Sequence, residues 1–532
     1  MKKLILFISA GIVVFGTSCK KYLDINNNPN QATTATAEVV LPQSIVYTAS
    51  NINAYNTYGS QLVGYSANAG GYGGFGTSVT YGFSNSTFSN LWSIGYDVLT
   101  DCQFVIDKTN ADPDYGYFNG AARIIKALNF QMLVDAYNDV PYKEALKGTA
   151  ELTPAYDKAE VIYADLAVQL DSAILVIKAT EDREHASSTS NVKKLGSGTD
   201  PMFRGSTTQW KKLANTLKLR LMIRARGKVT FANTTFDDAG FLTTDAIVNP
   251  GYARENGKQN PSWNSWAFAY DGSNGNRAWV PSRFVMGFYN GQKLSDARGY
   301  AIYYNFPSTP ANQLGFESNS VPSAPSGGAW LSGANTGSDR GSTTGGGSIG
   351  ILKAASWGEP LLLAAESYFL QAEAAVRGIS TGGNAKALFD AGVLASFKYL
   401  YLKPDGTYDP DWVPETDYAA YMDDNSGSYL VHFELAAGLE QQIEAIITQK
   451  YIALNFIHGH EAWNEYRRTH YPAIVNGSSD AYQSFASTQS IITRPDKLPT
   501  RVLYPTTEAS NNGTNMPKDI SNTRSFIFWA LQ

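Results

Sequence analysis

Apolar residues recur at intervals of three and four along several stretches of the chain. Residues 119–137 and 153–177 show the pattern most clearly. This spacing places apolar side chains on one face of an α-helix, so both stretches are predicted to be amphipathic helices. Pro154 suits the first turn of the second helix. Three further candidates of the same kind are residues 208–226, 359–377 and 438–457.

Amphipathic helices of this kind cannot bury their apolar faces alone. We therefore expect a scaffold of stacked helix–turn–helix pairs like tetratricopeptide units, with degenerate and interrupted repeats. Two long stretches near 64–90 and 250–350 interrupt the helical pattern and are rich in Gly, Ser, Asn and aromatic residues. Loops of this length are usually functional or disordered. The predicted fold class is mainly α, with tetratricopeptide-like helix pairs and a long irregular, loop-rich region.

The N-terminus has the pattern of a lipoprotein signal peptide. Lys2 and Lys3 precede an apolar stretch at residues 4–15, which is too short to span a bilayer stably. It ends in Gly16-Thr17-Ser18-Cys19, small residues followed by a cysteine that becomes acylated after cleavage. Each buried methylene contributes about 0.8 kcal/mol, so two or three acyl chains hold a protein at a membrane durably. We predict a signal peptide at 1–18, a lipidated N-terminus and tether at 19–35, and a folded body at 36–532.

The cysteine content and net charge argue against a disulfide and against nucleic acid as a partner. The chain has two cysteines, and lipidation of Cys19 leaves Cys102 without an intramolecular disulfide partner. With 42 basic and 47 acidic side chains the net charge is −5, which gives no basic field for nucleic acid. No apolar run after residue 19 is long enough to cross a membrane. Nucleic acid and a membrane-spanning body are therefore not expected.

Several separated motifs are spread along the whole chain: Cys19 with Tyr22-Leu23-Asp24, Asp139-Val140-Pro141-Tyr142 with Glu144-Ala145, Lys218-Leu219-Arg220-Leu221, 366–378, 459–468, and Leu498-Pro499-Thr500-Arg501 with Tyr504-Pro505. In type and order they resemble the motifs of one family, the SusD/RagB outer-membrane nutrient-binding lipoproteins of Bacteroidetes.

The resemblance implies a helical body of four tetratricopeptide-like helix pairs that supports an irregular ligand-binding region. It also implies a lipid-anchored, surface-exposed outer-membrane protein that sits as a lid on a SusC-like TonB-dependent transporter and passes it a nutrient. The ligand in such proteins is often an oligosaccharide, and some relatives take peptides. No catalytic role and no cofactor follow from the resemblance, although some members bind a structural calcium ion.

Carbohydrates present apolar C–H faces and polar hydroxyl rims, so a sugar site needs aromatic platforms beside polar side chains. The second irregular stretch has this mixture, and a Gly-rich loop at 71–76 adds an aromatic tip. Because that loop lacks the strand and helix of a nucleotide site, we interpret it as a flexible loop that touches ligand. The candidate ligand-binding residues are Trp263, Asn264, Trp266, Tyr270, Asp271, Arg277, Trp279 and Tyr72.

Other polar groups have competing interpretations. His458, His460 and Glu461 lack metal-site spacing, so we expect Glu461, Trp463, Arg467 and Arg468 to form a packed, hydrogen-bonded polar cluster. Asp423-Asp424-Asn425 and Glu434 show only weak calcium-loop spacing. Glu366 and Glu373 lie two helical turns, about 10.5 Å, apart, beyond the usual glycosidase separation.

We therefore expect a binding protein without catalytic activity. The alternatives are a peptide-binding member of the same uptake system, a surface glycoside hydrolase, and a structural subunit whose aromatic residues contact only the transporter.

Overall fold

The computed structural model describes residues 35–186, 190–333 and 349–532. The signal peptide, Cys19 and nearly all of the tether at 19–35 lie outside these residues. The largest cluster of buried apolar side chains extends from Ala37 to Ala530, so the described chain is built around one core. No helix in the described ranges has the length and apolar composition needed to cross a bilayer.

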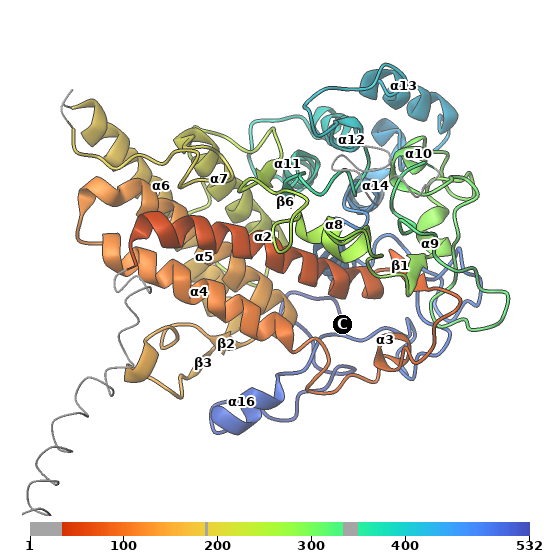
Figure 1. The fold of residues 1–532 in the computed structure, drawn as a ribbon, viewed down its shortest axis with the longest axis horizontal. Helices are drawn as coiled ribbons and strands as arrows, with labels where there is room; N and C mark the ends of the chain where they lie inside the picture. The colour runs from red at the N-terminus through yellow and green to blue at the C-terminus, as the bar shows by residue number, and fades with distance from the viewer. Residues whose placement is uncertain (1–34, 187–189, 334–348) are drawn as a thin grey trace, which may run out of the picture.

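The first half of the chain forms a row of long helices, each packed on the next (Figure 1). Helix α2 packs on α4, α4 on α5, α5 on α6, and α6 on α7. The bounds are α2 Ala37–Leu62, α4 Asn90–Thr109, α5 Gly116–Tyr137, α6 Ala159–His185 and α7 Thr207–Arg224.

A second group of helices follows the irregular region. Helix α11 packs on α12 and α14, and its contact with α7 joins the two groups. This pairing of successive helices confirms the predicted tetratricopeptide-like scaffold. The bounds are α11 Ala364–Val376, α12 Ala385–Tyr401, α13 Pro414–Asp424, α14 Gly438–Ala453 and α15 Gly459–Thr469.

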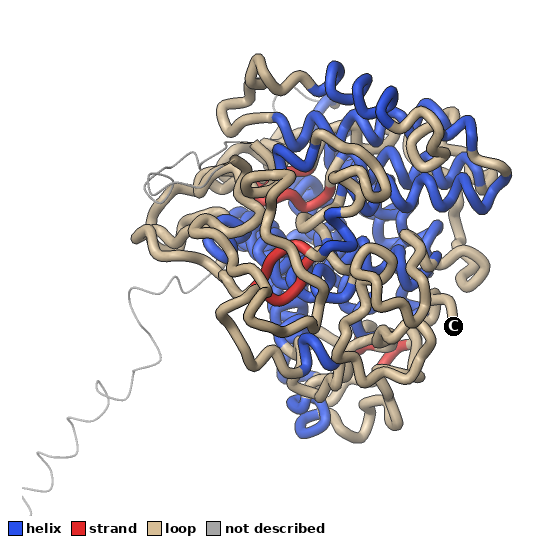
Figure 2. The backbone as a smooth tube through the Cα atoms, turned by 90° about the vertical axis from the view of Figure 1, so that its right-hand side faces the viewer, coloured by secondary structure: helices blue, strands red, loops and turns tan. Residues whose placement is uncertain are grey.

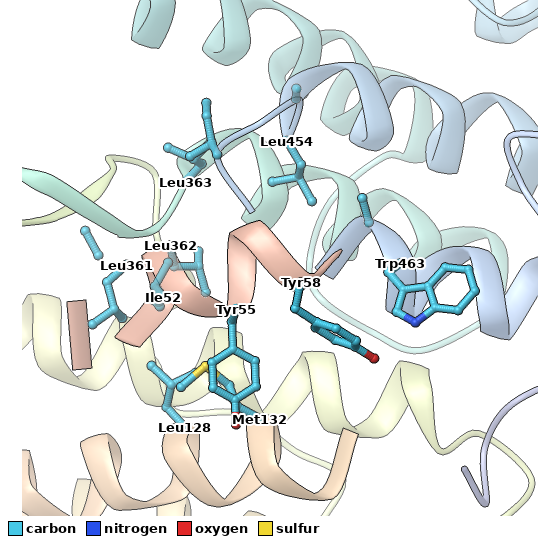
Figure 3. Close-up of a cluster of buried hydrophobic side chains, with 14 of the residues drawn as sticks. Ile52, Tyr55, Tyr58, Leu128, Met132, Leu361, Leu362, Leu363, Leu454 and Trp463 are labelled. Atoms are coloured by element: carbon cyan, nitrogen blue, oxygen red, sulfur yellow. The ribbon is translucent and has the colours of Figure 1, made fainter. Parts of the chain in front are cut away.

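Helix α2 contacts both groups, and Figure 3 shows its side chains packed among residues from each of them. Its side chains Ile52, Tyr55 and Tyr58 are at most 2% exposed. Against α15 the two backbones almost touch, because a Cβ atom on Gly59 would lie 2.1 Å from the carbonyl carbon of Gly459. Glycine is required here by space, and the contact ties the first described helix to one near the end of the chain.

The irregular region covers one side of the helices, as the tan tube in Figure 2 shows. The strands of the described chain form three two-stranded antiparallel pairs: β1 with β5 joins the two irregular stretches, β2 with β3 lies between α5 and α6, and β4 pairs with β6. The bounds of the short elements are β1 Ser66–Asn68, α3 Thr77–Thr80, β2 Val140–Pro141, β3 Tyr156–Asp157, β4 Ala246–Val248, α8 Pro261–Trp266, β5 Trp279–Pro281, α9 Arg283–Met286, α10 Arg298–Ile302, β6 Glu359–Leu362 and α16 Thr506–Asn511, with 3₁₀ turns at Pro113–Tyr115, Gly148–Ala150 and Phe433–Leu435.

The five helices predicted from periodicity all exist, but two begin later than expected. Helix α6 starts at Ala159 because Tyr156 and Asp157 pair with Val140 and Pro141 as a short strand. Helix α11 starts at Ala364 because Glu359–Leu362 pairs with β4. In both places an extended pairing replaces the first turn that the apolar spacing predicts.

Candidate functional site at the loop surface

The two irregular stretches meet in one surface. Strand β1 from the first pairs with β5 from the second, with Ser66 opposite Pro281 and Asn68 opposite Trp279. Beyond the strand, the Ala69 amide donates to the Ala278 carbonyl at 2.8 Å, and the Gly70 amide donates to the Pro322 carbonyl at 2.9 Å. Segments about 200 residues apart in sequence are therefore joined directly below the loop at 71–76.

Four of the predicted ligand-binding residues are exposed in the loop region. The rings of Tyr72 and Tyr270 are 51% and 45% exposed, and Asn264 and Asp271 are also exposed. A bridge between Phe268 and Asn274 closes the turn that carries Tyr270 and Asp271. Hydrogen bonds from the Ser273 amide and hydroxyl lower the pKa of Asp271, so this acceptor stays ionised. These side chains provide two open rings and two polar groups.

The other four predicted residues are buried, which corrects the expectation that they face a ligand. Trp263, Trp266, Trp279 and Arg277 are at most 6% exposed. The ring of Trp279 packs edge-on against Phe75 with centroids 5.4 Å apart. Aromatic side chains bury large areas when packing partners are available, and these loops supply such partners. In this structure the three tryptophans form the interior of the loop region.

Arg277 holds the backbone of this region together. Its guanidinium donates to the carbonyl oxygens of Trp266 and Ser326, each at 2.7 Å, and to that of Ala267. The Ala267 carbonyl also accepts from the Gly275 amide at 2.9 Å, so Arg277 adds to the backbone hydrogen bonds of this turn. Arg277 therefore stabilises the surface from below and does not project from it.

Helix α8 is fixed to the scaffold by a buried carboxyl group. Glu359 of β6 accepts hydrogen bonds from the Asn260 side-chain amide at 2.8 Å and the Ser262 hydroxyl at 2.6 Å. Asn260 in turn caps α8 by accepting from the Trp263 amide at 2.8 Å. Burial raises the pKa of Glu359 to about 7, although the bonds from Ser262 and Asn260 favour the charged form. Sequence spacing contains no signal for this contact because its partners lie about 100 residues apart.

A family model described as "Starch-binding associating with outer membrane" matches residues 29–505. This range covers most of the chain. The chain belongs to the SusD-like family. The family is one of outer-membrane-associated, carbohydrate-binding proteins. No match was found among curated protein sequences.

Solved structures of SusD-like proteins share this fold. A SusD homologue from Bacteroides uniformis is 23% identical with a TM-score of 0.64, over 93% of this chain and 99% of that one. A Bacteroidetes SusD-like protein is 18% identical with a TM-score of 0.65, over 94% and 100%. A chitin-binding SusD homologue from Flavobacterium johnsoniae is 20% identical with a TM-score of 0.58, over 92% and 98%. These identities establish the fold and not the ligand.

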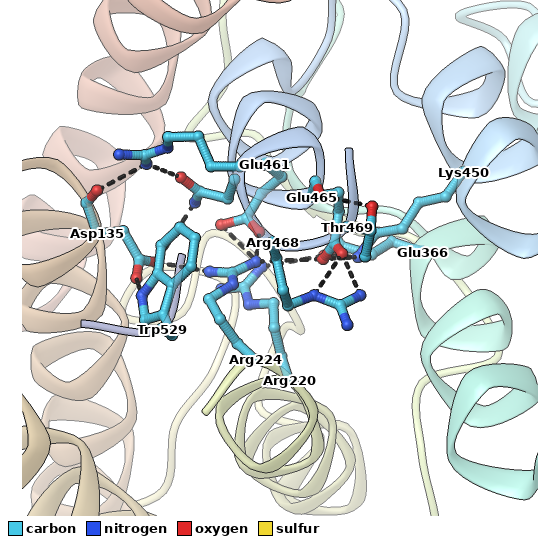
Figure 4. A network of polar contacts seen from close by, with 12 residues as sticks. Asp135, Arg220, Arg224, Glu366, Lys450, Glu461, Glu465, Arg468, Thr469 and Trp529 are labelled. Atoms are coloured by element: carbon cyan, nitrogen blue, oxygen red, sulfur yellow. Dashed lines mark hydrogen bonds and ion pairs between the residues drawn. The ribbon is translucent and has the colours of Figure 1, made fainter. Parts of the chain in front are cut away.

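The polar cluster predicted in this SusD-like chain is confirmed, and it is larger than the sequence indicates (Figure 4). Arg224 of α7 contacts Asp135 at 2.5 Å and also binds Glu461. Arg468 binds Glu373 at 2.7 Å, and Trp463 packs beneath Arg467. Burial opposes the charged form of Glu461, but Arg220 and Arg224 hold its pKa well below its usual value. The cluster joins α5, α7, α11, α14 and α15.

Glu366 and Glu373 belong to this cluster. Glu366 is fully buried and lies 3.3 Å from Arg220 and 3.4 Å from Lys450. Glu373 binds both Arg377 and Arg468 at 2.7 Å. Their carboxylates therefore contact basic side chains of the protein and do not flank an open cleft, as a glycosidase pair requires.

The two histidines near this cluster are buried beside it. His458 lies 3.0 Å from the Pro360 carbonyl oxygen, and burial lowers the pKa of His460 to about 3. Among the described residues, no group of three or more His, Cys, Asp or Glu side chains is placed to hold a metal ion. The Asn425 side chain bonds Ser295 and Tyr421. A calcium ion at Asp423-Asp424-Asn425 and Glu434 therefore stays a prediction.

Proposed function

We propose that the protein is a surface lipoprotein that captures an oligosaccharide and delivers it to a SusC-like TonB-dependent transporter. The family description supports carbohydrate binding at the outer membrane. The observation that supports the ligand assignment is the exposure of two aromatic rings, Tyr72 and Tyr270, in the two loop stretches that the β1–β5 pair joins. The exposed side chains of Asn264 and Asp271 provide hydrogen-bonding groups for sugar hydroxyls.

Calorimetric titration with oligosaccharides tests the ligand assignment. One similar structure is described as chitin-binding, so chitin oligosaccharides are the first probe, followed by starch oligosaccharides and peptides. We expect Tyr72→Ala and Tyr270→Ala to weaken sugar binding about tenfold each, because each removes a stacking face. Tyr47 on α2 is 50% exposed and lies outside the loops, so Tyr47→Ala is the matched control. Equal affinities for all three variants would contradict the proposed surface.

The same titrations separate the alternatives. Heats with peptides and none with sugars favour the peptide-binding role, and heats with neither ligand favour the structural subunit. Shorter glycan products after incubation with the purified protein would show a hydrolase.

The anchor and the partner need separate tests. We expect a palmitate analogue to label the wild-type protein and not Cys19→Ser, because the acyl chains attach at that thiol. Co-purification from outer membranes is expected to recover a TonB-dependent transporter. An unlabelled wild-type protein would contradict the anchor, and a pull-down without a transporter would contradict delivery.

A further inference from the structure

A second candidate site is a cavity that is lined mainly by basic side chains and by none of the loop residues described above. It has a volume of 490 Å³ and lies where the ends of α7, α11 and α15 meet the start of α14 and the C-terminal tail. Binding sites for small molecules typically have volumes of about 300–1,000 Å³. Five basic side chains line it, together with one acidic side chain, Glu440: Arg224, Arg226, Lys228, Arg377 and Arg468.

Two of these cations serve the interior of the protein. Arg224 and Arg468 are at most 8% exposed, and buried carboxylates neutralise them. The positive ends of such side chains also compensate the negative C-terminal ends of α7 and α15. These structural roles account for Arg224 and Arg468 without a ligand.

The other three basic side chains, Arg226, Lys228 and Arg377, have N–H groups that form no hydrogen bond or ion pair with the described residues. In the part of the chain that the structure describes, the exposed side chains of Arg226 and Lys228 contact no acidic residue within ion-pair distance. Arg377 donates only through Nε, to Glu373 at 2.7 Å. That bond orients the guanidinium and leaves both terminal nitrogens without a partner among the described residues. A planar pair of N–H groups held in this way matches a carboxylate.

The cavity also has apolar surface beside these cations. Leu439 and Leu531 are each 48% exposed, and Tyr471 adds an aromatic ring. A second cavity of 550 Å³ adjoins the first, with Glu440, Thr469, Tyr471 and Leu531 lining both. The occupant must therefore combine an acidic group with an apolar face.

We propose that this basic cavity binds a uronic acid unit of an acidic oligosaccharide, with Arg377, Arg226 and Lys228 around its carboxylate. A hexuronate has a carboxylate at one edge of a ring whose C–H face is apolar, which is the combination that the lining matches. The choice of a sugar rests on the proposed function, and the choice of an acid rests on the cavity itself.

The probe is trigalacturonate, with its methyl ester as the uncharged counterpart. We expect Arg226→Gln with Lys228→Gln, and separately Arg377→Gln, to raise the Kd for trigalacturonate about tenfold. Binding should also weaken with salt, and the ester should bind wild type and variants alike. Arg377→Gln loses its bond to Glu373, so its thermal unfolding is measured as well. The double variant changes only exposed side chains and tests the proposal without that complication.

The matched control is Lys143→Gln with Lys147→Gln, which removes the same charge from another exposed segment and should leave the Kd unchanged. Unchanged affinity in both cavity variants would overturn the proposal, as would tighter binding of triglutamate than of trigalacturonate. If Tyr72→Ala alone abolishes trigalacturonate binding, the loop surface is the site and this inference fails. If neutral sugars never bind and the cavity variants lose the acidic one, the loop-surface proposal fails and this inference stands.

Discussion

Replacing Arg224 by methionine removes a buried cation from the centre of the polar cluster. The Arg224 side chain is 1% exposed and contacts Asp135 at 2.5 Å, Glu465 at 3.5 Å, and Glu461. Methionine keeps part of the length but leaves these carboxylates with fewer counter-charges. Removing one partner of a buried ion pair costs about 3–5 kcal/mol. We expect Arg224→Met to lower the free energy of unfolding by about that amount, which is large against the roughly 5–15 kcal/mol of a typical protein.

Urea unfolding followed by tryptophan fluorescence measures this loss. The control is Lys178→Met, which breaks a solvent-screened pair with Asp237 at 2.9 Å and should change the free energy of unfolding little. Adding Glu461→Gln to Arg224→Met should cost less than the sum of the two single changes, because they remove one shared contact. If Arg224→Met unfolds within about 1 kcal/mol of the Lys178 control, the cluster does not stabilise the fold as described.

Three further predictions follow from single contacts. Gly59→Ala places a methyl group 2.1 Å from the backbone of Gly459 and should lower the free energy of unfolding by about 1–3 kcal/mol in thermal melts, whereas Gly73→Ala, which meets open space, should change it by at most about 0.5 kcal/mol. The folded pKa of Glu359, about 7, exceeds the unfolded value of 4.5, so its stabilising contribution is complete below pH 4.5 and is lost as the pH rises through 7. Glu359→Gln should therefore gain stability relative to wild type by up to about 1.4 kcal/mol per pH unit between these values, and a constant difference in urea midpoints would contradict the raised pKa. Burial raises the pKa of Cys102 to about 12, so a thiol reagent should label this residue only after urea unfolds the chain, and rapid labelling of the native protein would contradict its burial.

The apolar spacing predicted five helices, and it missed α4, α12 and α13 as well as α2. That helix is buried on most of its circumference, and it contains Pro42 and buried polar residues such as Asn56. Asn56 depends on distant partners, since its side chain donates to the Phe456 carbonyl at 2.9 Å and accepts from the Gly459 amide at 2.8 Å, in addition to a local bond from the Ser60 hydroxyl at 3.0 Å. Without those partners the pattern of α2 looks neither amphipathic nor continuous.

The candidate ligand residues show a similar limit. Composition located the aromatic-rich loops but not the direction in which each ring points. Trp266 is buried because Trp330 and Phe456 pack against it, and both come from segments far along the chain. The basic cavity contains no local motif at all, because its lining comes from five separate segments. Such sites appear only when the tertiary contacts are known.

The backbone contact between Gly59 and Gly459 has a consequence for the order of synthesis. A ribosome completes α2 long before it reaches α15, so the face of α2 at Asn56 and Gly59 lacks its partner until some 400 further residues have been made. A chain that ends before α15 leaves this face of α2 without its partner. We expect such a fragment to expose apolar surface and to be a target for chaperones and proteases.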